Sequence, residues 1–421
     1  MLQRRLTVII PVMISIWMPG CGGKYSNLTE DQLVAEARKI HDRVITIDTH
    51  DDIPTNFATE EVDPGVRGER QIDIPKMQEG GLDVGFFIVY VGQTERTPEN
   101  YEKAKEQAMT KFNAIHRMTE EMYPDKIDLA YKPDDVRRIH KSGKLVACIG
   151  IENGYAIGKD LSLLKKYQEL GARYITLAHG GHNDICDSAT PRQNLGDGES
   201  EHNGVSEFGE QVIAEMNRVG IMVDVSHISK KSMLDAVRLS KAPVIASHSS
   251  TRALCDNPRN MDDEQLLALK KNGGVMQTVA LGAYVKQDPP EKQDAVRALR
   301  EEMGIASRGA WRGLSDEQRA EYRRRMAELD EKWPRANVKE FVDHIDHAVK
   351  LIGIDHVGIS SDFDGGGGIV GWQDASETFN VTLELVRRGY SEKDIEKIWS
   401  GNVLRVWAEV EEIAAKLQSS T

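Results

Sequence analysis

Histidines and carboxylates follow short apolar runs in this sequence. The first group lies in VITIDTHDDIP (residues 44–54), where His50 and Asp52 are two positions apart. Side chains at that spacing project to the same side of an extended chain, so the pair could bind one metal ion. A solvated turn rich in Asp has the same composition. This pair alone leaves both interpretations open.

The same arrangement recurs further along the chain. Five further runs have a histidine or a carboxylate at or near their ends. The runs are LVACIGIEN, RYITLAH, IMVDVSH, PVIASH and HVGISSDFDG, and the residues are Glu152, His179, His227, His248, Asp362 and Asp364. Imidazole and carboxylate ligands without thiolate are typical of catalytic zinc, manganese or iron sites. A carboxylate such as Glu152 can bridge two ions, and Asp362 is placed to carry protons. The pattern therefore predicts a catalytic metal centre.

Eight short apolar segments must position these side chains, and amphipathic stretches such as Glu207–Val219 and Asp263–Lys271 lie between them. The order favours a (β/α)₈ TIM-type barrel, whose active site lies at the C-terminal ends of its strands. An open doubly wound sheet is the alternative, but it usually has a Gly-rich phosphate loop after its first strand. The predicted strands are Val44–Asp48, Val84–Val91, Leu145–Glu152, Tyr174–Ala178, Ile221–Ser226, Val244–His248, Val275–Ala280 and Val357–Ser361.

Bulk composition is that of a globular protein with a large core. The chain has 421 residues, of which 40% are hydrophobic and 29% charged, and its formal net charge is -13. Its basic residues form no cluster with interleaved aromatics, which argues against nucleic acid as a partner. Since α/β barrels of this size are often one domain, we expect a single barrel domain over 41–410 and a tail over 411–421.

The N-terminus has the features of an export signal. A basic start precedes an apolar run, 6–18, that is too short to span a bilayer, and Cys21 follows Gly20. The pattern resembles a bacterial lipoprotein signal, which implies cleavage of residues 1–20, a lipid on Cys21 and a tether over 21–40. We then expect a protein of the bacterial cell envelope that faces the periplasm and contacts membrane only through this anchor. A plain secretory signal is the alternative.

The remaining cysteines do not define a scaffold. Cys148, Cys186 and Cys255 are too few for a disulfide framework and form no Cys-x-x-Cys metal motif. One pair could bond in an oxidising envelope, and the sequence does not choose which.

A charged insert at about 287–336 interrupts the alternation of strands and helices. Ser315 and Gln318 form a capping-box pattern for a helix that runs to about Trp333. A solvated helical face is the expectation, with a lid or an oligomer contact, such as that of a homodimer, as alternatives.

Other polar residues are assigned no chemistry. His182 and His202 lie in a polar loop and are expected at the surface. Asp48, Asp51 and Asp364 stay open between orienting a ligand histidine and stabilising a turn.

Taken together, the motifs resemble the membrane (renal) dipeptidase family, a metallopeptidase branch of the amidohydrolase barrels. Matching stretches span residues 47 to about 406; they are IDTHDDIP, QIDIPKMQEGGLDVGFFIVYV, GIENG, RYITLAH, FGEQVIAEMNRVGIMVDVSHIS, APVIASHSS, NPRNMDD, HVGISSDFDG and GNVLRV. The resemblance implies two zinc ions. It assigns His50 and Asp52 to one ion, His227 and His248 to the other, and Glu152 to both.

The resemblance also implies roles around the metals. Asp362 matches the acid/base residue, His179 the histidine that contacts the tetrahedral intermediate, and Arg259 the arginine that holds the substrate carboxylate. Tyr284 is the candidate for a further substrate contact. The implied reaction is hydrolysis of dipeptides, including those with a C-terminal D-residue, by a hydroxide that bridges the metals.

Two alternatives remain. Other amidohydrolase-type hydrolases act on N-acyl amino acids, lactones or phosphoesters, and typically have a His-x-His motif and a modified lysine after the fourth strand. Here the first motif is His50-Asp51-Asp52, and RYITLAH has no lysine. A non-enzymatic binding lipoprotein would be expected to have lost a ligand or the acid/base residue, and none is lost. The family's Glu-Gly-Gly segment reads Glu152-Asn153-Gly154, which preserves the ligand.

Overall fold

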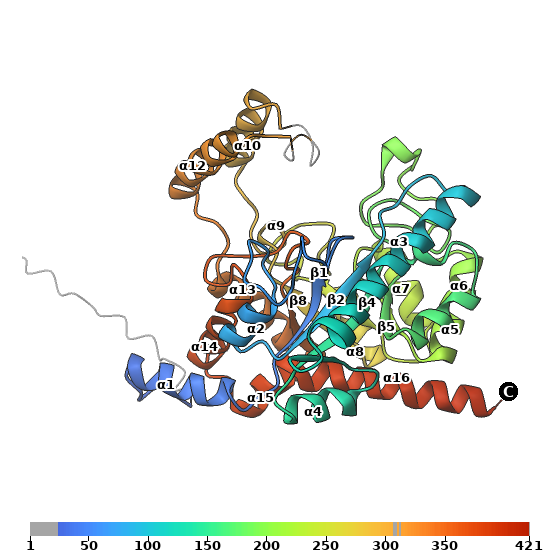
Figure 1. Ribbon diagram of the computed structural model, residues 1–421, viewed down its shortest axis with the longest axis horizontal. Helices are drawn as coiled ribbons and strands as arrows, with labels where there is room; N and C mark the ends of the chain where they lie inside the picture. Colours follow the sequence, from blue (N-terminus) through green and yellow to red (C-terminus); the bar gives the residue numbers. More distant parts are fainter. Residues whose placement is uncertain (1–23, 306–309, 311–312, 421) are drawn as a thin grey trace, which may run out of the picture.

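Strands and helices alternate along the chain and form a (β/α)₈ barrel in the computed structural model, which describes residues 24–305, 310 and 313–420 (Figure 1). The parallel strands follow the order β1-β2-β4-β5-β6-β7-β8-β9. The ring closes where Asp51 pairs with Phe363, just beyond β9, and the Asp52 amide donates to the Phe363 carbonyl at 2.8 Å. The strand bounds are β1 (Ile47–Asp52), β2 (Val84–Tyr90), β3 (Ile127–Leu129), β4 (Leu145–Glu152), β5 (Ala172–Thr176), β6 (Met222–Asp224), β7 (Ile245–Ser249), β8 (Val275–Val279) and β9 (Val357–Ser360).

All eight predicted strands are present, but the first was predicted too early in the chain. The prediction placed it at 44–48, whereas β1 runs through His50 to Asp52, and its register with β2 shifts between Asp48 and Asp51. The pair predicted to bind metal, His50 and Asp52, is thus part of the strand. The short β3 pairs with β4 outside the ring and was not predicted.

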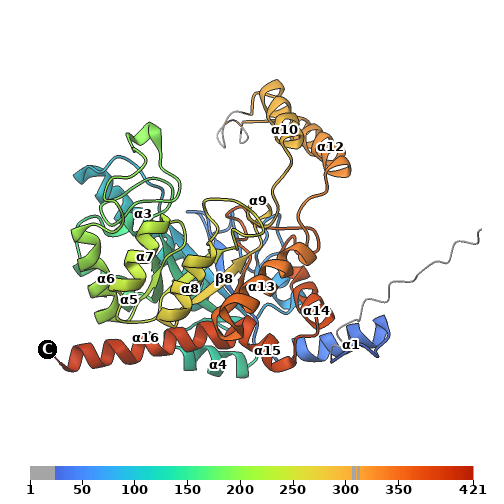
Figure 2. The same ribbon diagram turned by 180° about the vertical axis from the view of Figure 1, so that it is seen from behind.

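Helices cover the outside of the barrel (Figures 1 and 2). The amphipathic stretch Glu207–Val219 is α6, as predicted, and a capping box of Ser315 and Gln318 begins α12, whose C-cap is Trp333. The helix bounds are α1 (Glu30–His41), α2 (Ile74–Gly80), α3 (Pro98–Arg117), α4 (Pro133–Lys141), α5 (Ser162–Glu169), α6 (Glu207–Val219), α7 (Lys230–Leu239), α8 (Asp263–Asn272), α9 (Gly282–Val285), α10 (Pro290–Glu302), α12 (Asp316–Lys332), α13 (Val338–Ile352), α14 (Phe379–Arg387), α15 (Glu392–Glu396) and α16 (Asn402–Ser419).

Two apolar cores hold this architecture. One lies between the strands and the surrounding helices. The other joins side chains of the strands, such as Phe86 and Ile245, to α16, whose Trp407 is fully buried and packs edge-on against Phe86. Because α16 passes beneath the barrel, opposite the end where the strands finish, the lower end is closed and the functional end is the upper one (Figure 1). Most of the predicted tail 411–421 belongs to this helix.

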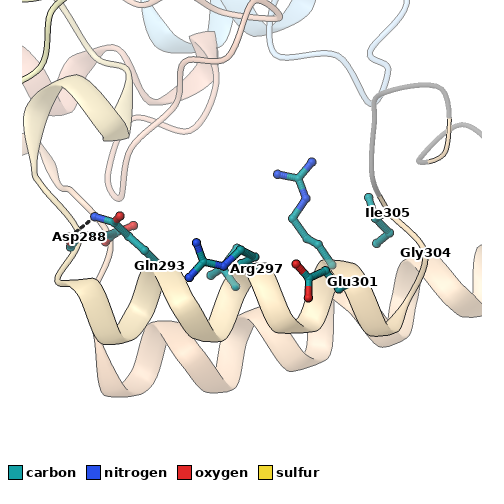
Figure 3. A pocket seen from close by; sticks show the side chains of 8 residues that line it. Asp288, Gln293, Arg297, Glu301, Gly304 and Ile305 are labelled. Carbon is teal, nitrogen blue, oxygen red and sulfur yellow. Dashed lines mark hydrogen bonds between the residues drawn. The ribbon is translucent and has the colours of Figure 1, made fainter.

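The charged insert forms an arm of two helices, α10 and α12, that extends beyond the upper end of the barrel above α9 (Figure 2). Both ends of the arm meet at Lys292, whose ammonium contacts Asp288 at 3.1 Å, Asp330 at 3.0 Å and the Trp333 carbonyl at 3.0 Å. A cavity of about 760 Å³ lies along α10, lined by residues such as Gln293, Arg297 and Glu301 (Figure 3). No residue that lines it belongs to the predicted metal centre.

The structure bears on the predictions for the cysteines but not on those for the N-terminal segment. The predicted signal segment 1–20 and the predicted lipidation site Cys21 lie outside the described residues. Within the described ranges, no helix is long and apolar enough to cross a membrane. Cys148, Cys186 and Cys255 are all buried free thiols, so the disulfide considered for one pair among them is not formed.

Candidate metal centre

His50 is held in the barrel by a buried tyrosine. The Tyr174 hydroxyl donates to the Thr49 carbonyl at 2.8 Å, so it must accept from Nδ1–H of His50, which lies 2.9 Å away. In the neutral imidazole the Nε2 atom of His50 then carries the lone pair, and it is buried without a hydrogen-bond partner among the described residues. Burial would lower the pKa of His50, but the carboxylates of Glu152, Asp52 and Asp362 outweigh it and raise the pKa to about 9, so a bound cation displaces a proton from this atom. An imidazole fixed in this tautomer is prepared to bind a cation.

His248 is oriented in a similar way by a neighbouring serine. Ser247 Oγ donates to the Asp224 carboxylate at 2.6 Å and therefore accepts from His248 Nδ1–H at 2.8 Å. Asp224 also accepts from the amides of Ser226 and Ser247 at 3.0 and 2.9 Å. A carboxylate, a hydroxyl and an imidazole thus form a chain that leaves Nε2 of His248 as the free ligand atom.

One oxygen of Glu152 is the centre of the cluster. Oε1 lies 3.0 Å from Nε2 of His227 and 3.3 Å from Nε2 of His248. The Nε2 atoms of His50 and His179 lie 3.6 and 3.7 Å from the same oxygen. Four imidazoles from four strand ends therefore face a single carboxylate, the position that a ligand shared by two ions must occupy.

Asp52 and Asp362 complete the site on the side of β1 and β9. Asp52 Oδ2 lies 3.7 Å and Asp362 Oδ1 4.0 Å from His50 Nε2. A Cβ atom added to Gly365 would lie 2.3 Å from a carboxylate oxygen of each aspartate. Glycine at 365 thus lets the chain pass beside both carboxylates.

Two of these side chains are presented by strained backbone. His227 has φ 67° and Asp362 has φ 58°, a left-handed conformation that residues other than glycine rarely adopt. Such conformations persist only where the surrounding structure imposes them, and they concentrate at functional sites. In both cases the turn follows a strand of the barrel and directs the side chain toward the cluster.

The electrostatics show how crowded the carboxylates are. Burial raises the pKa of Asp362 well above its ordinary value, with Asp52 and Glu152 adding to the effect. Burial also raises the pKa of Asp52, to about 6, again with a contribution from Glu152. Burial lowers the pKa of His227 and His248 well below the ordinary value, so both imidazoles are neutral. Neutral imidazoles beside repelling carboxylates are the donor set that a divalent cation stabilises.

The predicted donors are therefore suited to metal. Three groups have donor atoms within 4.8 Å of one another, and they share members: His50, Glu152 and His248; Glu152, His179 and His227; His50, Asp52 and Asp362. All five predicted ligands occur in these groups. The groups also include His179 and Asp362, which sequence reasoning placed at the substrate.

Arg259 and Tyr284 lie together beside His248. Arg259 is buried and donates from Nη2 to the His248 carbonyl at 3.1 Å, and its guanidinium carbon lies 5.3 Å from the centre of the Tyr284 ring. Burial raises the pKa of Tyr284, while the positive charge of Arg259 opposes that shift. The Nε atom of Arg259 has no hydrogen-bond partner in the described part of the chain. A fork-shaped cation with an unused donor is suited to a carboxylate.

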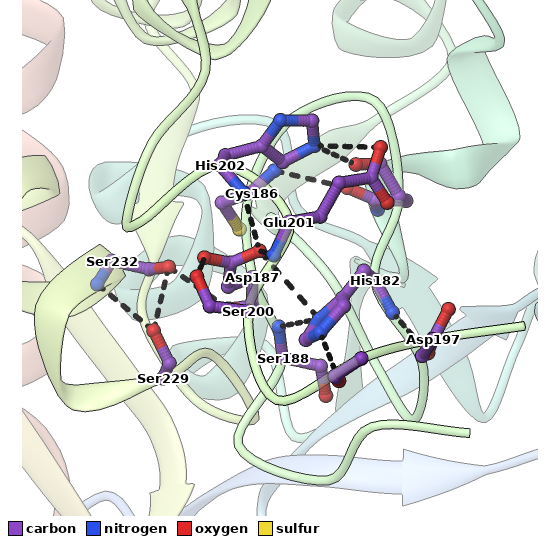
Figure 4. A network of polar contacts seen from close by, with 12 residues as sticks. His182, Cys186, Asp187, Ser188, Asp197, Ser200, Glu201, His202, Ser229 and Ser232 are labelled. Carbon is purple, nitrogen blue, oxygen red and sulfur yellow. Dashed lines mark hydrogen bonds and ion pairs between the residues drawn. The ribbon is translucent and has the colours of Figure 1, made fainter. Parts of the chain in front are cut away.

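The loop after β5 has a polar core of its own, and one prediction there is wrong. His182 was expected at the surface, but it is buried: Nδ1 accepts from the Ser188 amide at 3.0 Å and Nε2 donates to the Gly198 carbonyl at 3.1 Å. Asp187 accepts from Ser200 Oγ and from three backbone amides in the same loop (Figure 4).

This loop is also tied to the metal centre. Ser188 Oγ donates to the His179 carbonyl, and the Ala189 amide donates to the His227 carbonyl at 2.8 Å. Since both carbonyls belong to residues of the cluster, the loop fixes the backbone that presents two of its imidazoles. The role of His182 is to shape this loop.

The aspartates left open by the sequence do not bind ligand histidine side chains. Asp48 accepts from the backbone amides of His50 and Ser361 at 3.2 and 2.9 Å, and Asp364 accepts from the amide of Gln71 at 3.1 Å. Asp48 and Asp364 thus hold backbone, and Asp364 also pairs with Arg70 at 3.2 Å. Asp51 is buried, and its carboxylate has no hydrogen-bond partner among the described residues. The side chains that do orient ligands, Tyr174 and Ser247, were missed. The only sequence signal for these orienting side chains was the polar Asp224 within the apolar run IMVDVSH.

Comparison with known proteins agrees with this geometry. The sequence model of the membrane dipeptidase family (peptidase family M19) matches residues 34–421. Dipeptidase tcpJ of Claviceps purpurea is 33% identical over 349 residues, which cover 82% of this chain and 70% of that protein. Dipeptidase ataJ of Aspergillus terreus is 31% identical over 421 residues, covering 94% of this chain and 91% of that protein.

A solved structure has the same architecture. The crystal structure of the probable dipeptidase PvdM from Pseudomonas aeruginosa matches with a TM-score of 0.81 and 34% sequence identity. The match covers 91% of this chain and the whole of that chain.

Proposed function

The chain belongs to the membrane dipeptidase family, and from that premise we propose that it is a zinc-dependent dipeptidase with two ions per subunit. The observation that carries the proposal is the position of Glu152, whose Oε1 lies within 3.0 to 3.7 Å of four histidine Nε2 atoms. Imidazole and carboxylate donors without thiolate favour a catalytic zinc site.

His50 and Asp52 would hold one ion, His227 and His248 the other, and Glu152 both. Bound there, the metal pair supplies Lewis acidity toward a peptide carbonyl and a nucleophilic water at neutral pH. The protein's own contribution is to fix the donors in place. Tyr174 and Ser247 orient two of the histidines, and the strained turn at residue 227 directs a third into the cluster.

Asp362 is proposed as the acid/base residue. Its carboxyl is buried beside Asp52 and Glu152, and burial raises its pKa well above the ordinary value of 3.8. A carboxyl group in such surroundings can hold a proton near neutral pH and release it to the leaving amine. His179, whose Nε2 lies 3.7 Å from Glu152 Oε1, is proposed to contact the carbonyl oxygen as it becomes tetrahedral.

Arg259 is proposed to bind the substrate's C-terminal carboxylate, with Tyr284 beside it. The buried guanidinium has an unused Nε donor, and ion pairing with a carboxylate is strongest where water is excluded. Binding the C-terminal group and cleaving the adjacent bond limits the substrate to two residues.

The biological setting is proposed from the N-terminal sequence. An exported protein with a lipid on Cys21 would face the periplasm of a bacterial cell envelope, where turnover of the cell wall releases dipeptides. Substrates with a C-terminal D-residue are therefore included in the proposal, and a homodimer is the proposed assembly.

Hydrolysis of a panel of L-L and L-D dipeptides by zinc-loaded protein tests the proposed function. We expect turnover of dipeptides and a loss of roughly 10²- to 10⁴-fold in Asp362→Asn, the range for a general acid/base. Asp125→Asn, on an exposed turn, is the matched control. Turnover of an N-acyl amino acid, lactone or phosphoester but of no dipeptide would overturn the proposal. Undiminished turnover by Asp362→Asn would overturn the mechanism.

A further inference from the structure

Lys111 is a buried lysine of α3 that has no anionic partner. It is 5% exposed, and within the described ranges it forms no ion pair or hydrogen bond. Its ammonium instead lies over the Tyr90 ring, 5.5 Å from the centre. Burial lowers the pKa of Lys111, while the charges of Asp52 and Glu152 oppose that shift, which places the ammonium in the field of the metal centre.

The two other buried lysines of the described chain show what a structural role requires. Lys76 contacts Asp73 at 3.7 Å and Asp374 at 3.5 Å, and Lys292 contacts Asp288 and Asp330. Each of these ammonium groups is neutralised by two carboxylates. Since a buried charge without a partner is costly, Lys111 is the exception that a structural role does not explain.

A second cation, Arg192, lies beside His179. The half-buried Arg192 packs over Gly180, with its Nε and Nη2 atoms 3.0 and 3.1 Å from the position that a Cβ on this glycine would take. Its guanidinium forms no ion pair among the described residues. The Tyr90 ring lies between Lys111, whose ammonium is 5.5 Å from the ring centre, and His179, whose ring is 4.9 Å away. Lys111 and Arg192 are called here the cationic wall.

The strand order places Lys111 across the barrel from the proposed carboxylate site. Lys111 follows β2 and Arg259 follows β7, and these strands are four positions apart in either direction around the ring. A dipeptide that places its C-terminal carboxylate on Arg259 and its peptide bond at Glu152 therefore directs its N-terminal residue toward β2. Tyr90, the last residue of β2, and Lys111 lie on that side.

We propose that the cationic wall binds a carboxylate on the side chain of the substrate's N-terminal residue, so that dipeptides beginning with Asp or Glu are preferred. This inference rests on the proposed function. A charge-assisted hydrogen bond from a desolvated ammonium to a carboxylate supplies the preference, and the neutral amide of Gln at the same position does not gain it.

Binding of dipeptides to the metal-loaded Asp362→Asn protein, measured by calorimetry, tests the proposal without turnover. We expect L-Glu-L-Ala to bind about tenfold more tightly than L-Gln-L-Ala, the size of one charge-assisted hydrogen bond. Lys111→Gln in the same background should bring the ratio near one. Lys111→Arg should retain most of it, and Lys103→Gln, at an exposed position of the same helix, should leave it unchanged.

Arg192→Gln provides a second variant at a less buried position, and it should reduce the ratio in the same direction. Equal binding of the Glu and Gln dipeptides, or a uniform loss for all dipeptides in Lys111→Gln, would overturn the proposal. Preference for L-Lys-L-Ala would do the same. Because this readout is binding, a Glu preference without any dipeptide turnover by the parent protein would count against the proposed function alone.

Discussion

The Nε2 atoms of His227 and His248 lie 2.7 Å apart. Because the Nδ1 proton of His248 is donated to Ser247, its Nε2 atom presents a lone pair toward His227. Both imidazoles also face Oε1 of Glu152. A proton on His227 Nε2 can fill this gap as a hydrogen bond to His248, and a cation that binds both nitrogens and the carboxylate oxygen takes the place of that proton. Three donor atoms that converge on one point are therefore a reason to expect metal.

Replacing Glu152 with Gln should remove metal from the protein. The substitution removes the negative charge and can bring an amide N–H₂ group toward the histidine nitrogens, so it affects both proposed ions. We expect metal affinity to fall by at least about 100-fold, more than is usual for a residue that only supports a ligand. Metal content after dialysis, measured by elemental analysis, provides the readout. Glu169→Gln, on the exposed end of α5, is the control, and two ions retained per chain in Glu152→Gln would contradict the assignment.

Tyr174→Phe should weaken metal binding without loss of the fold. The change removes the hydroxyl that accepts from His50 Nδ1, and the imidazole is then free to rotate or change tautomer. Affinity for zinc should fall by about 10- to 100-fold, measured by competition with a chelator. Tyr167→Phe removes a buried hydroxyl that donates to the Ala156 carbonyl in another part of the barrel. If both variants bind zinc equally well, Tyr174 does not orient the ligand.

Gly365→Ala should lower activity because the new methyl group has no space. Its Cβ would lie 2.3 Å from oxygens of both Asp52 and Asp362, so one carboxylate must move. Displacement of about 1 Å at a catalytic group costs roughly 10²-fold in rate. In Gly282→Ala the nearest atom to the new Cβ is 3.9 Å away, so that variant should retain full activity. Steady-state kinetics on one dipeptide compares the two, and a fully active Gly365→Ala protein would show that the carboxylates tolerate displacement.

Asp187→Asn should make the stability less dependent on acid pH. Burial disfavours the charged form, but hydrogen bonds from Ser200 and three amides outweigh it and lower the pKa of Asp187 to about 2, from an ordinary value of 3.8. Its contribution of about 2 kcal/mol is therefore fully present above pH 4 and is lost as the pH falls toward 2. The gap in unfolding free energy between wild type and variant should shrink as the pH falls from 5 to 3 in urea titrations. A gap that is constant over this range would be inconsistent with the lowered pKa.

The strands were predictable because they are apolar on both faces and are followed by amphipathic helices. The exception is β1, because its charged and polar side chains, Asp48, His50 and Asp52, interrupt the hydrophobic pattern that marks the other strands. Its true bounds depend on the shift in register against β2 and on the pairing with Phe363, both of which are tertiary contacts.

The cluster around Glu152 could be predicted as a set of residues, since strand ends in a barrel meet at one rim. The side chains that orient the histidines of this cluster could not be predicted. Tyr174 and Ser247 occupy ordinary positions in strands, and only the fold shows that they contact His50 and His248. His182 was misplaced for a related reason, because a loop that hydrogen-bonds to itself creates a buried site without any apolar signal.

The contacts of Lys292 have a consequence for how this chain can vary. The chain leaves the barrel at the start of α10 and returns at Trp333, and one ammonium group binds both places. An insert whose two ends are held together can be lengthened or shortened at small entropic cost, since doubling the length of a loop adds only about 0.6 kcal/mol. Related proteins can therefore carry arms of very different length, or none, on the same ring of strands.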